Sequence, residues 1–248
     1  VGERDVDDDN IQPRVGFSWD LTGEGRSVLR GGAGLFTGRY LLVPSFTELQ
    51  QNGESGRILH TNVNIPPYFP LDPEDPQNTG FPLPADSTLL ADSLEAPESF
   101  QANLGFTQKL GATGLFADVE AVWAEGDNEI VVRDTNWGGN DNPVRPDPDW
   151  NQINMYTNEG RSEYAALIAS LNGTLSGGHL ITASFTVTAK KNIADDFSPE
   201  FPIGYPSDPA DIEGEWGRSR ADERYRVVLS GVFNLPWDVT VAPIFEWG

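Results

Sequence analysis

Apolar and polar residues alternate one by one along several stretches of this chain, and these stretches come in pairs. In RVGFSWD, residues 14–20, the odd positions carry large apolar side chains and the even positions carry small, polar or charged ones. A glycine-containing turn follows, and the alternation resumes over residues 29–35. Side chains of a β-strand point alternately to its two faces, so this pattern predicts a hairpin over about residues 12–38.

The same pattern predicts three more hairpins, over about residues 99–125, 164–190 and 224–247. Its most regular example is ITASFTVT at residues 181–188, where apolar and hydroxyl-bearing or small residues alternate almost without a break. Each hairpin has a short turn near its middle, rich in glycine or proline. We therefore expect an all-β chain with about eight antiparallel strands.

Three long stretches without sustained periodicity separate the hairpins, at about residues 39–98, 126–163 and 191–223. They hold 16 of the 19 prolines and 26 of the 38 acidic residues. Connections in compact domains are mostly about 4–6 residues long, so loops of this length need an explanation. Regular alternation of short turns with long loops is typical of a transmembrane β-barrel, which has short periplasmic turns and long extracellular loops.

A barrel of this type assigns a different environment to each parity. The apolar parity faces lipid, and aromatic residues near the strand ends resemble the girdles at the membrane interfaces. The polar parity faces a wet lumen, which predicts the following lumen-facing residues: Arg14, Arg30, Asp118, Glu120, Thr182, Ser184 and Thr186. The alternative is a soluble β-sandwich, in which the apolar parity meets a second sheet. Alternation by itself does not separate the two.

Charge and composition exclude several functions. The formal net charge is −22, and only 16 basic residues are scattered along the chain, which argues against a surface that binds nucleic acid. The chain has no cysteine, so it has no disulfide, thiolate metal site or cysteine nucleophile. No run of about 18 apolar residues predicts a transmembrane helix, whereas a membrane strand needs only about 9–11 residues.

Four segments resemble a known family. They are IQPRVGFSWDLTGEGRSVLRGGAGLFTGRY, FQANLGFTQKLGATGLFADVEAVWAEG, GRSEYAALIASLNGTLSGGHLITASFTVTAKKNIADD and DERYRVVLSGVFNLPW. In this order they resemble the barrel of TonB-dependent outer-membrane receptors, in the Oar-like branch whose plug follows a carboxypeptidase-regulatory-like domain. The resemblance implies a barrel of about 22 strands in the bacterial outer membrane, filled by an N-terminal plug. It also implies uptake of a scarce ligand with energy delivered through TonB.

The chain departs from the full pattern of these receptors. We expect no signal peptide, TonB box or plug domain within its 248 residues, so TonB would act through parts of the protein outside this chain. Eight strands alone could close into a small barrel filled by side chains. Gly16, Gly32, Gly34 and Gly105 leave little to fill such a barrel, so we expect a segment of a larger barrel wall. Its expected partners are outer-membrane lipid and an unknown small ligand or peptide.

One long loop carries candidate ligand-binding residues. The stretch NWGGNDNPVRPDPDWNQINMY combines aromatic rings with carboxylates and amides. The candidates are Trp137, Asn140, Asp141, Trp150 and Tyr156. Such a set suits a sugar, a peptide or a cation held by oxygen atoms. The simpler interpretation is a loop that packs on itself, with tryptophans as a small core.

Catalytic motifs are missing, and no enzymatic function is expected. His60 and His179 are the only histidines, and neither lies near a nucleophile or metal-ligand motif. The alternating aspartates of residues 5–9 lack the glycine and the distal glutamate of a calcium loop, so they indicate an acidic turn. No cofactor is expected, although the acidic loops leave Ca²⁺ open. The alternatives to a receptor are a structural or adhesive surface β-protein that binds cations or glycans, and a soluble β-sandwich binding protein or hydrolase.

Overall fold

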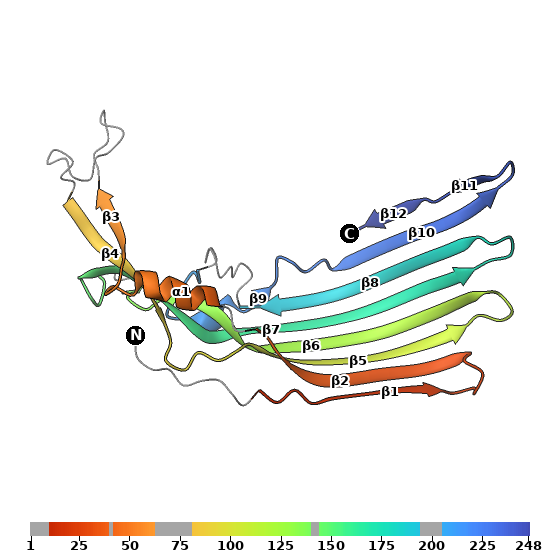
Figure 1. Cartoon of the computed structure of the whole chain (residues 1–248), viewed down its shortest axis with the longest axis horizontal. Coiled ribbons are helices and arrows are strands. Elements are labelled where there is room, and N and C mark those ends of the chain that lie inside the picture. Colours follow the sequence, from red (N-terminus) through yellow and green to blue (C-terminus); the bar gives the residue numbers. More distant parts are fainter. Residues whose placement is uncertain (1–9, 40–41, 63–80, 140–143, 194–204) are drawn as a thin grey trace.

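The computed structural model describes residues 10–39, 42–62, 81–139, 144–193 and 205–248. Its main strands form one long curved sheet (Figure 1). They are β1 (Arg14–Asp20), β2 (Ser27–Thr37), β5 (Glu98–Lys109), β6 (Leu115–Asp134), β7 (Trp150–Thr174), β8 (Leu180–Asn192), β10 (Tyr225–Leu235), β11 (Val239–Val241) and β12 (Ile244–Trp247). The order along the sheet is β1-β2-β5-β6-β7-β8-β10-β11, and β12 also pairs with β10. These pairs are antiparallel, which confirms the predicted architecture.

The sheet stays open within the described residues. At one edge, β1 pairs with β2 alone. At the other edge, β11 and β12 both pair with β10. These two edges lie on opposite sides of the sheet in Figure 1. The strands therefore form part of a barrel wall, as expected, and do not close into a small barrel of their own.

The two ends of the sheet differ in their connections (Figure 1). At one end, which we call the short-turn end, four short turns join β1 to β2, β5 to β6, β7 to β8 and β10 to β11. The other, the excursion end, carries the following elements: α1 (Leu42–Gln51), β3 (Ile58–Asn62), β4 (Phe81–Leu90), the 3-10 helix η2 (Ile212–Glu215) and β9 (Gly217–Arg218). In the described part of the chain, no helix is long and apolar enough to cross a membrane.

The excursion end contains more regular structure than the sequence predicted. β6 continues to Asp134 and β7 begins at Trp150, so strands fill most of the expected loop at 126–163. β4 adds a parallel strand to β7 between Ala85 and Leu90. Other segments cover both faces of these strands, and apolar residues therefore occupy both parities. The period of two that identifies a half-exposed strand is lost for this reason.

Two small cores form on opposite faces of β6 and β7 at the excursion end. Val131 and Val132 are neighbours in β6, so their side chains point to opposite faces. The first core consists of Leu90, Leu94, Ile130, Val132 and Tyr156. The second core consists of Val131, Ile193 and Ile212, with Trp216 packed against it. These cores fix the connecting segments to the wall.

Toward the short-turn end, the registers sort apolar residues onto one face of the sheet. Trp19 pairs with Leu29, Leu29 with Phe106, and Phe106 with Val119. The row continues through Ala169, Phe185, Val227 and Trp247. A slip of one residue in any pair would move that strand's apolar set to the other face, so this pattern fixes the register.

This side of the sheet, which we call the apolar face, is not enclosed by the described chain. Its large exposed members include Val15, Phe17, Trp19, Leu104, Phe106, Val119, Trp123, Leu167, Phe185, Tyr225, Leu229, Phe245 and Trp247. Val119, Leu167 and Phe185 are 48%, 51% and 43% exposed. A soluble sandwich would cover these side chains with a second sheet, and no such layer is present among the described residues.

Candidate functional site

The opposite side, the polar face, carries the candidate site. The registers place on it all seven residues predicted to line the lumen: Arg14, Arg30, Asp118, Glu120, Thr182, Ser184 and Thr186. One cross-strand row, for example, runs from Arg30 through Gly105, Glu120 and Ile168 to Thr186. The seven predicted residues come from the four strands β1, β2, β6 and β8. The polar face divides into two regions with different chemistry.

A charge cluster occupies the first region, across β2, β5 and β6. The guanidinium of Arg30 lies 3.4 Å from Asp118 Oδ1 and 3.4 Å from Glu120 Oε2. Arg30 Nη1 also donates to Thr107 Oγ1, and that hydroxyl donates to Asp118 Oδ1. Asn103 Nδ2 donates to Glu120 Oε1 over 2.8 Å. Two carboxylates thus share one guanidinium, and the cluster has an excess of one negative charge.

Glycine creates the space in which Arg30 lies. Gly105 is the direct cross-strand partner of Arg30. A Cβ at Gly105 would lie 3.2 Å from Arg30 Nε and 3.3 Å from Arg30 Cζ, so the guanidinium rests on the bare backbone. The pair Arg14 and Gly34 repeats this arrangement, because a Cβ at Gly34 would lie 2.7 Å from Arg14 Cγ. Both arginines therefore lie flat along the wall.

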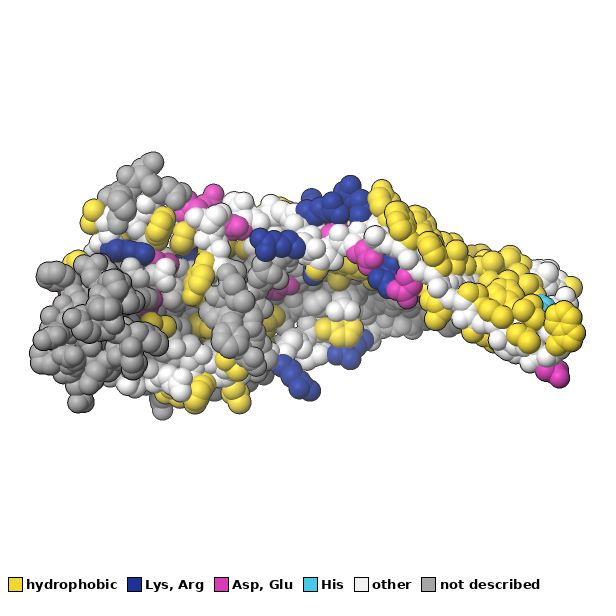
Figure 2. All heavy atoms as spheres, turned by 90° about the horizontal axis from the view of Figure 1, so that it is seen from above, with side chains coloured by type: hydrophobic (Ala, Val, Ile, Leu, Met, Phe, Trp, Pro, Cys, Tyr) yellow, Lys and Arg dark blue, Asp and Glu magenta, His cyan; other side chains and the backbone are white. Residues whose placement is uncertain are grey.

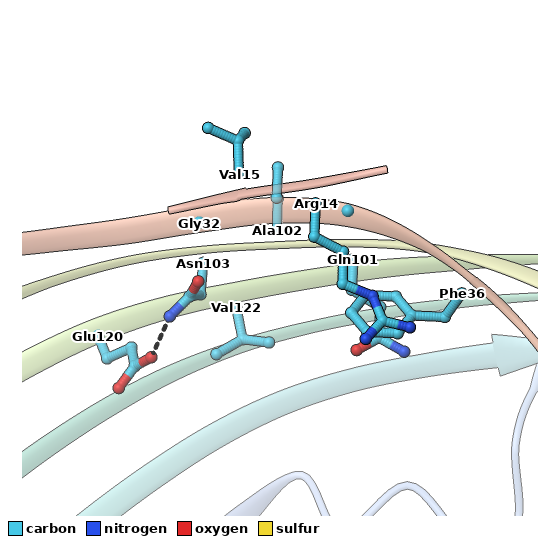
Figure 3. A pocket seen from close by; sticks show the side chains of 11 residues that line it. Arg14, Val15, Gly32, Phe36, Gln101, Ala102, Asn103, Glu120 and Val122 are labelled. Carbon is cyan, nitrogen blue, oxygen red and sulfur yellow. Dashed lines mark hydrogen bonds between the residues drawn. The ribbon is translucent and has the colours of Figure 1, made fainter. Parts of the chain in front are cut away.

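A shallow hollow of about 370 Å³ lies beside Arg14 and extends to Glu120 of the charge cluster. Its lining residues on the polar face include Arg14, Gly32, Gln101, Asn103 and Glu120. Figure 3 shows Gln101, Asn103 and Glu120 on one side of the strands, while Val15 and Ala102 point away to the other. The Arg14 guanidinium carbon lies 4.3 Å from the centre of the Phe36 ring, a cation–π contact that holds the arginine in place.

Hydroxyl groups make up the second region, on β7 and β8. Thr182 pairs with Asn172, and Ser184 pairs with Ser170. Asn172 Nδ2 donates to Ser170 Oγ over 3.2 Å. Between residues 181 and 187, β8 carries no charged residue. This second region offers uncharged hydrogen-bonding groups beside the charge cluster of β2, β5 and β6.

Three of the five predicted ligand-binding residues, Trp137, Trp150 and Tyr156, lie within the described structure. Asn140 and Asp141 lie outside the described residues. Trp137 is half-buried, and the Arg145 guanidinium carbon lies 5.6 Å from its ring centre. Its Nε1 is buried without a hydrogen-bond partner within the described ranges. Trp150 begins β7 and packs beside Gly53, where a Cβ would lie 2.7 Å from its ring.

Tyr156 has a packing role, which replaces the expected ligand role. Its side chain is 0% exposed and lies in the first core with Leu90 and Val132. A ring without exposed surface cannot present a platform to a ligand. For this residue the simpler interpretation, self-packing of the segment, describes the structure. Tyr156 belongs to β7, and its strand partners cover it.

Polar side chains that the sequence reasoning missed hold the segment around Trp137 in place. Asp134 Oδ1 accepts from the backbone N–H of Asn136 (2.9 Å) and of Ile153 (3.0 Å), and Oδ2 pairs with Arg145. Asn136 Nδ2 donates to the carbonyls of Asp147 and Trp150, both at 2.9 Å. No sequence motif marks this network, because its members meet only when β6 and β7 pair.

The excursion end also contains perturbed titratable groups. Burial raises the pKa of the Tyr205 phenol, and the charges of Asp86 and Asp134 raise it further. Burial acts to raise the pKa of Asp222, but hydrogen bonds from Thr188 and Arg218 outweigh it and leave the pKa below its usual value. The bond that Thr188 donates to Asp222 fastens this connecting segment to β8.

Metal ligation finds little support in the part of the chain that the structure describes. No group of three or more histidine, aspartate and glutamate side chains is placed there to hold a metal ion. The aspartates of residues 5–9, considered above for calcium, lie outside the described residues. Binding of Ca²⁺ by the acidic segments therefore stays an untested prediction.

Comparisons with known proteins agree on the fold. Residues 3–240 match the family described as outer membrane beta barrel domain. Among solved structures, the outer membrane transporter YddB from Escherichia coli aligns over 96% of this chain with a TM-score of 0.63 and 15% identity. The FrpB iron transporter from Neisseria meningitidis aligns over 94% with a TM-score of 0.52 and 10% identity. No curated protein sequence matches significantly.

The chain spans only part of these neighbours. It covers 28% of the Escherichia coli transporter chain and 26% of the Neisseria meningitidis chain. It also aligns with a chain of the FpvAI–pyocin S2 complex, at a TM-score of 0.51 and 10% identity, and covers 23% of that chain. In each case an open sheet of this chain superposes on part of a larger structure.

Proposed function

Since this chain belongs to the outer membrane beta barrel domain family, we propose that it forms part of the wall of an outer-membrane receptor that takes up a ligand without catalysis. The family match and the open sheet confirm the predicted barrel wall and the outer-membrane location. The apolar face then contacts lipid, because a lipid-facing strand surface must be apolar. The predicted resemblance to receptor barrels is confirmed, whereas the Oar-like branch stays a resemblance.

One observation carries the proposal of uptake. The sheet is open and carries charged and hydroxyl groups on the face opposite lipid, which is the composition expected for the wall of a wide, water-containing lumen. Solved neighbours that contain a similar wall include an outer membrane transporter and an iron transporter. We therefore assign the seven polar-face residues named above to the lumen.

The two regions of the polar face suit different tasks. Two carboxylates around Arg30 form a fixed cluster of charges, which suits bracing against a plug or another lumen element. The hydroxyls of Thr182, Ser184 and Thr186 suit a path along which a polar ligand binds weakly. The exterior ligand contacts would come from the predicted residues Trp137, Asn140, Asp141 and Trp150. Energy would reach the receptor through TonB and parts of the protein outside this chain.

Uptake is tested in cells with and without the gene. Accumulation of a radiolabelled ferric siderophore, an oligosaccharide and a peptide is measured in the parent, in the gene-deletion strain and in a strain without TonB. We expect the accumulation of at least one probe to fall to the same extent in the gene-deletion strain and in the strain without TonB. An adhesive protein would instead leave all three probes unchanged and lose attachment to cations or glycans, and that result would overturn the proposal.

A further inference from the structure

The turn between β10 and β11 differs from the other three short turns. In those three turns, left-handed backbone occurs only at glycines: Gly23, Gly25, Gly111, Gly177 and Gly178. In the fourth turn, Trp237 and Asp238 adopt φ values of 66° and 57°. Bulky L-residues rarely adopt this conformation, because the Cβ approaches the following carbonyl. The chain therefore places a strained tryptophan where glycine would fit without strain.

The side chain of Trp237 is also the most exposed of the large hydrophobic residues in the described chain, at 91%. Its neighbours Leu235 and Val239 are a cross-strand pair, and both are exposed. Val241 pairs with Phe233, a member of the same parity. The hydrophobic surface of the turn is thus continuous with the apolar face. Figure 2 shows hydrophobic side chains gathered over this end of the sheet, on the side of β10–β12.

Hydrogen bonds hold this turn firmly against its neighbour. The backbone N–H of Asn234 donates to His179 Nδ1 over 3.1 Å. Asn234 Nδ2 donates to the carbonyls of Gly177 (3.4 Å) and Gly178 (3.3 Å), which belong to the β7–β8 turn. Thr240 Oγ1 donates to Asn234 Oδ1 over 3.3 Å. These bonds fix the backbone at the base of the turn that carries Trp237.

We propose that the β10–β11 turn is a membrane anchor, with the Trp237 indole inserted into the headgroup region of the periplasmic leaflet. Tryptophan favours this region because it combines a large apolar ring with one N–H donor. Continuity with the lipid-contacting apolar face identifies lipid as the occupant. The three glycine-containing turns stand in water. This inference depends on the barrel and its membrane location, and it does not depend on uptake.

Quenching of tryptophan fluorescence tests the anchor. The intact protein is folded into phosphatidylethanolamine–phosphatidylglycerol vesicles, and the signal of Trp237 is taken as the difference between the wild type and Trp237→Phe. Its quenching by lipids brominated near the headgroup is compared with quenching by aqueous acrylamide. The matched control carries Thr113→Trp in the Trp237→Phe background, which places an indole in the exposed β5–β6 turn at the same end.

We expect brominated lipid to quench Trp237 about twofold more strongly than the control indole, and acrylamide to quench it about twofold less. Equal quenching of both indoles by acrylamide, without an effect of brominated lipid, would show a tryptophan in water and overturn the proposal. Protection from both quenchers would also overturn it, because that result places a protein on the turn. An uptake defect is not part of the readout, so failure here leaves the proposed function intact.

Discussion

The hairpin of β6 and β7 passes through two environments, and its two halves differ accordingly. Near the short-turn end, apolar and polar residues alternate, and Val119 remains 48% exposed on the apolar face. Near the excursion end, Val131 and Val132 are 3% and 2% exposed, although they point to opposite faces. The strands and their pairing continue through both halves, with irregularities between Gly126 and Val131. The comparison shows that the surroundings, and not the strand, decide which side chains are buried.

The polar groups differ between the halves as well. In the half of the sheet near the short-turn end, which we call the spanning half, Arg30 and two carboxylates lie on one open face. At the excursion end, the carboxylate of Asp134 is 5% exposed and accepts from two backbone N–H groups besides Arg145. A buried carboxylate requires such partners, whereas a carboxylate on an open face is also hydrated. The polar groups at the excursion end are therefore satisfied in the way that is usual in the interior of a protein.

The largest effect is expected for Tyr156→Ala. The ring is fully buried, so its removal leaves a cavity in the first core and lowers the local free energy of unfolding by about 3–5 kcal/mol. Hydrogen exchange of the β4 amides measures this loss, because β4 is attached to β7 beside Tyr156. Amides of β6 near Val119 should keep their protection.

A matched pair on one strand serves as the control for Tyr156→Ala. Val132→Ala removes a buried side chain and should cost about 1.5 kcal/mol or more, whereas Val119→Ala removes a side chain that lipid covers and should cost less. Equal losses at the two valines would contradict a different environment for the two halves.

The second effect tests the lipid face through neighbouring residues of β7. Leu167→Arg places a charge on the apolar face and should lower the free energy of unfolding in vesicles by about 2–4 kcal/mol. Ile168→Arg places the same side chain on the polar face, opposite Glu120, and should cost much less. Urea unfolding of the vesicle-inserted intact protein measures both. A larger loss for Ile168→Arg would reverse the assignment of the faces.

The smallest effect concerns acid. The side chain of Asp222 is 2% exposed and pairs with Arg218 Nε over 2.7 Å. Its pKa lies below the usual value of 3.8 in the folded chain, because hydrogen bonds to the carboxylate outweigh burial. The ionised group stabilises the fold above its usual pKa, and this contribution is lost as the pH falls through the lowered value.

Titration from about pH 6 to about pH 2 should therefore loosen residues 205–223 before the spanning strands. Fluorescence of Trp216, whose ring centre lies 4.3 Å from the Arg161 guanidinium carbon, reports this release. The Asp222→Asn variant should lose part of the pH dependence in this range. If the Asp222→Asn variant kept the full pH dependence of the fluorescence, Asp222 would not be the group that causes the release.

The sequence predicts the spanning half well because only one of its faces is apolar. Alternation at residues 181–188 indicates a half-exposed strand, and the registers place Thr182, Ser184 and Thr186 on one face. At the excursion end the same pattern gives no prediction, because the strands there are apolar on both faces. Ile130, Val131 and Val132 are covered on both faces, so they show no period of two. The parallel pairing of β4 with β7 depends on distant residues and has no local pattern.

The candidate site shows the same division. Arg30 and Glu120 are readable from their parity, but their meeting requires the register of three strands. Tyr156 resembled a binding aromatic because it stands in a polar, proline-rich stretch, and only tertiary packing turns it inward. The contact between Arg145 and Asp134 likewise forms across a hairpin that the sequence does not mark.

Large side chains in this wall lie across glycines that are their direct strand partners. Arg14 lies over Gly34, Phe17 over Gly31 and Arg30 over Gly105. In each pair the large side chain occupies the space that a side chain at the glycine position would fill, so the sizes of the two residues depend on each other. Enlarging any of these three glycines would push its partner side chain away from the wall. A larger residue can therefore replace one of these glycines only when its partner side chain becomes smaller.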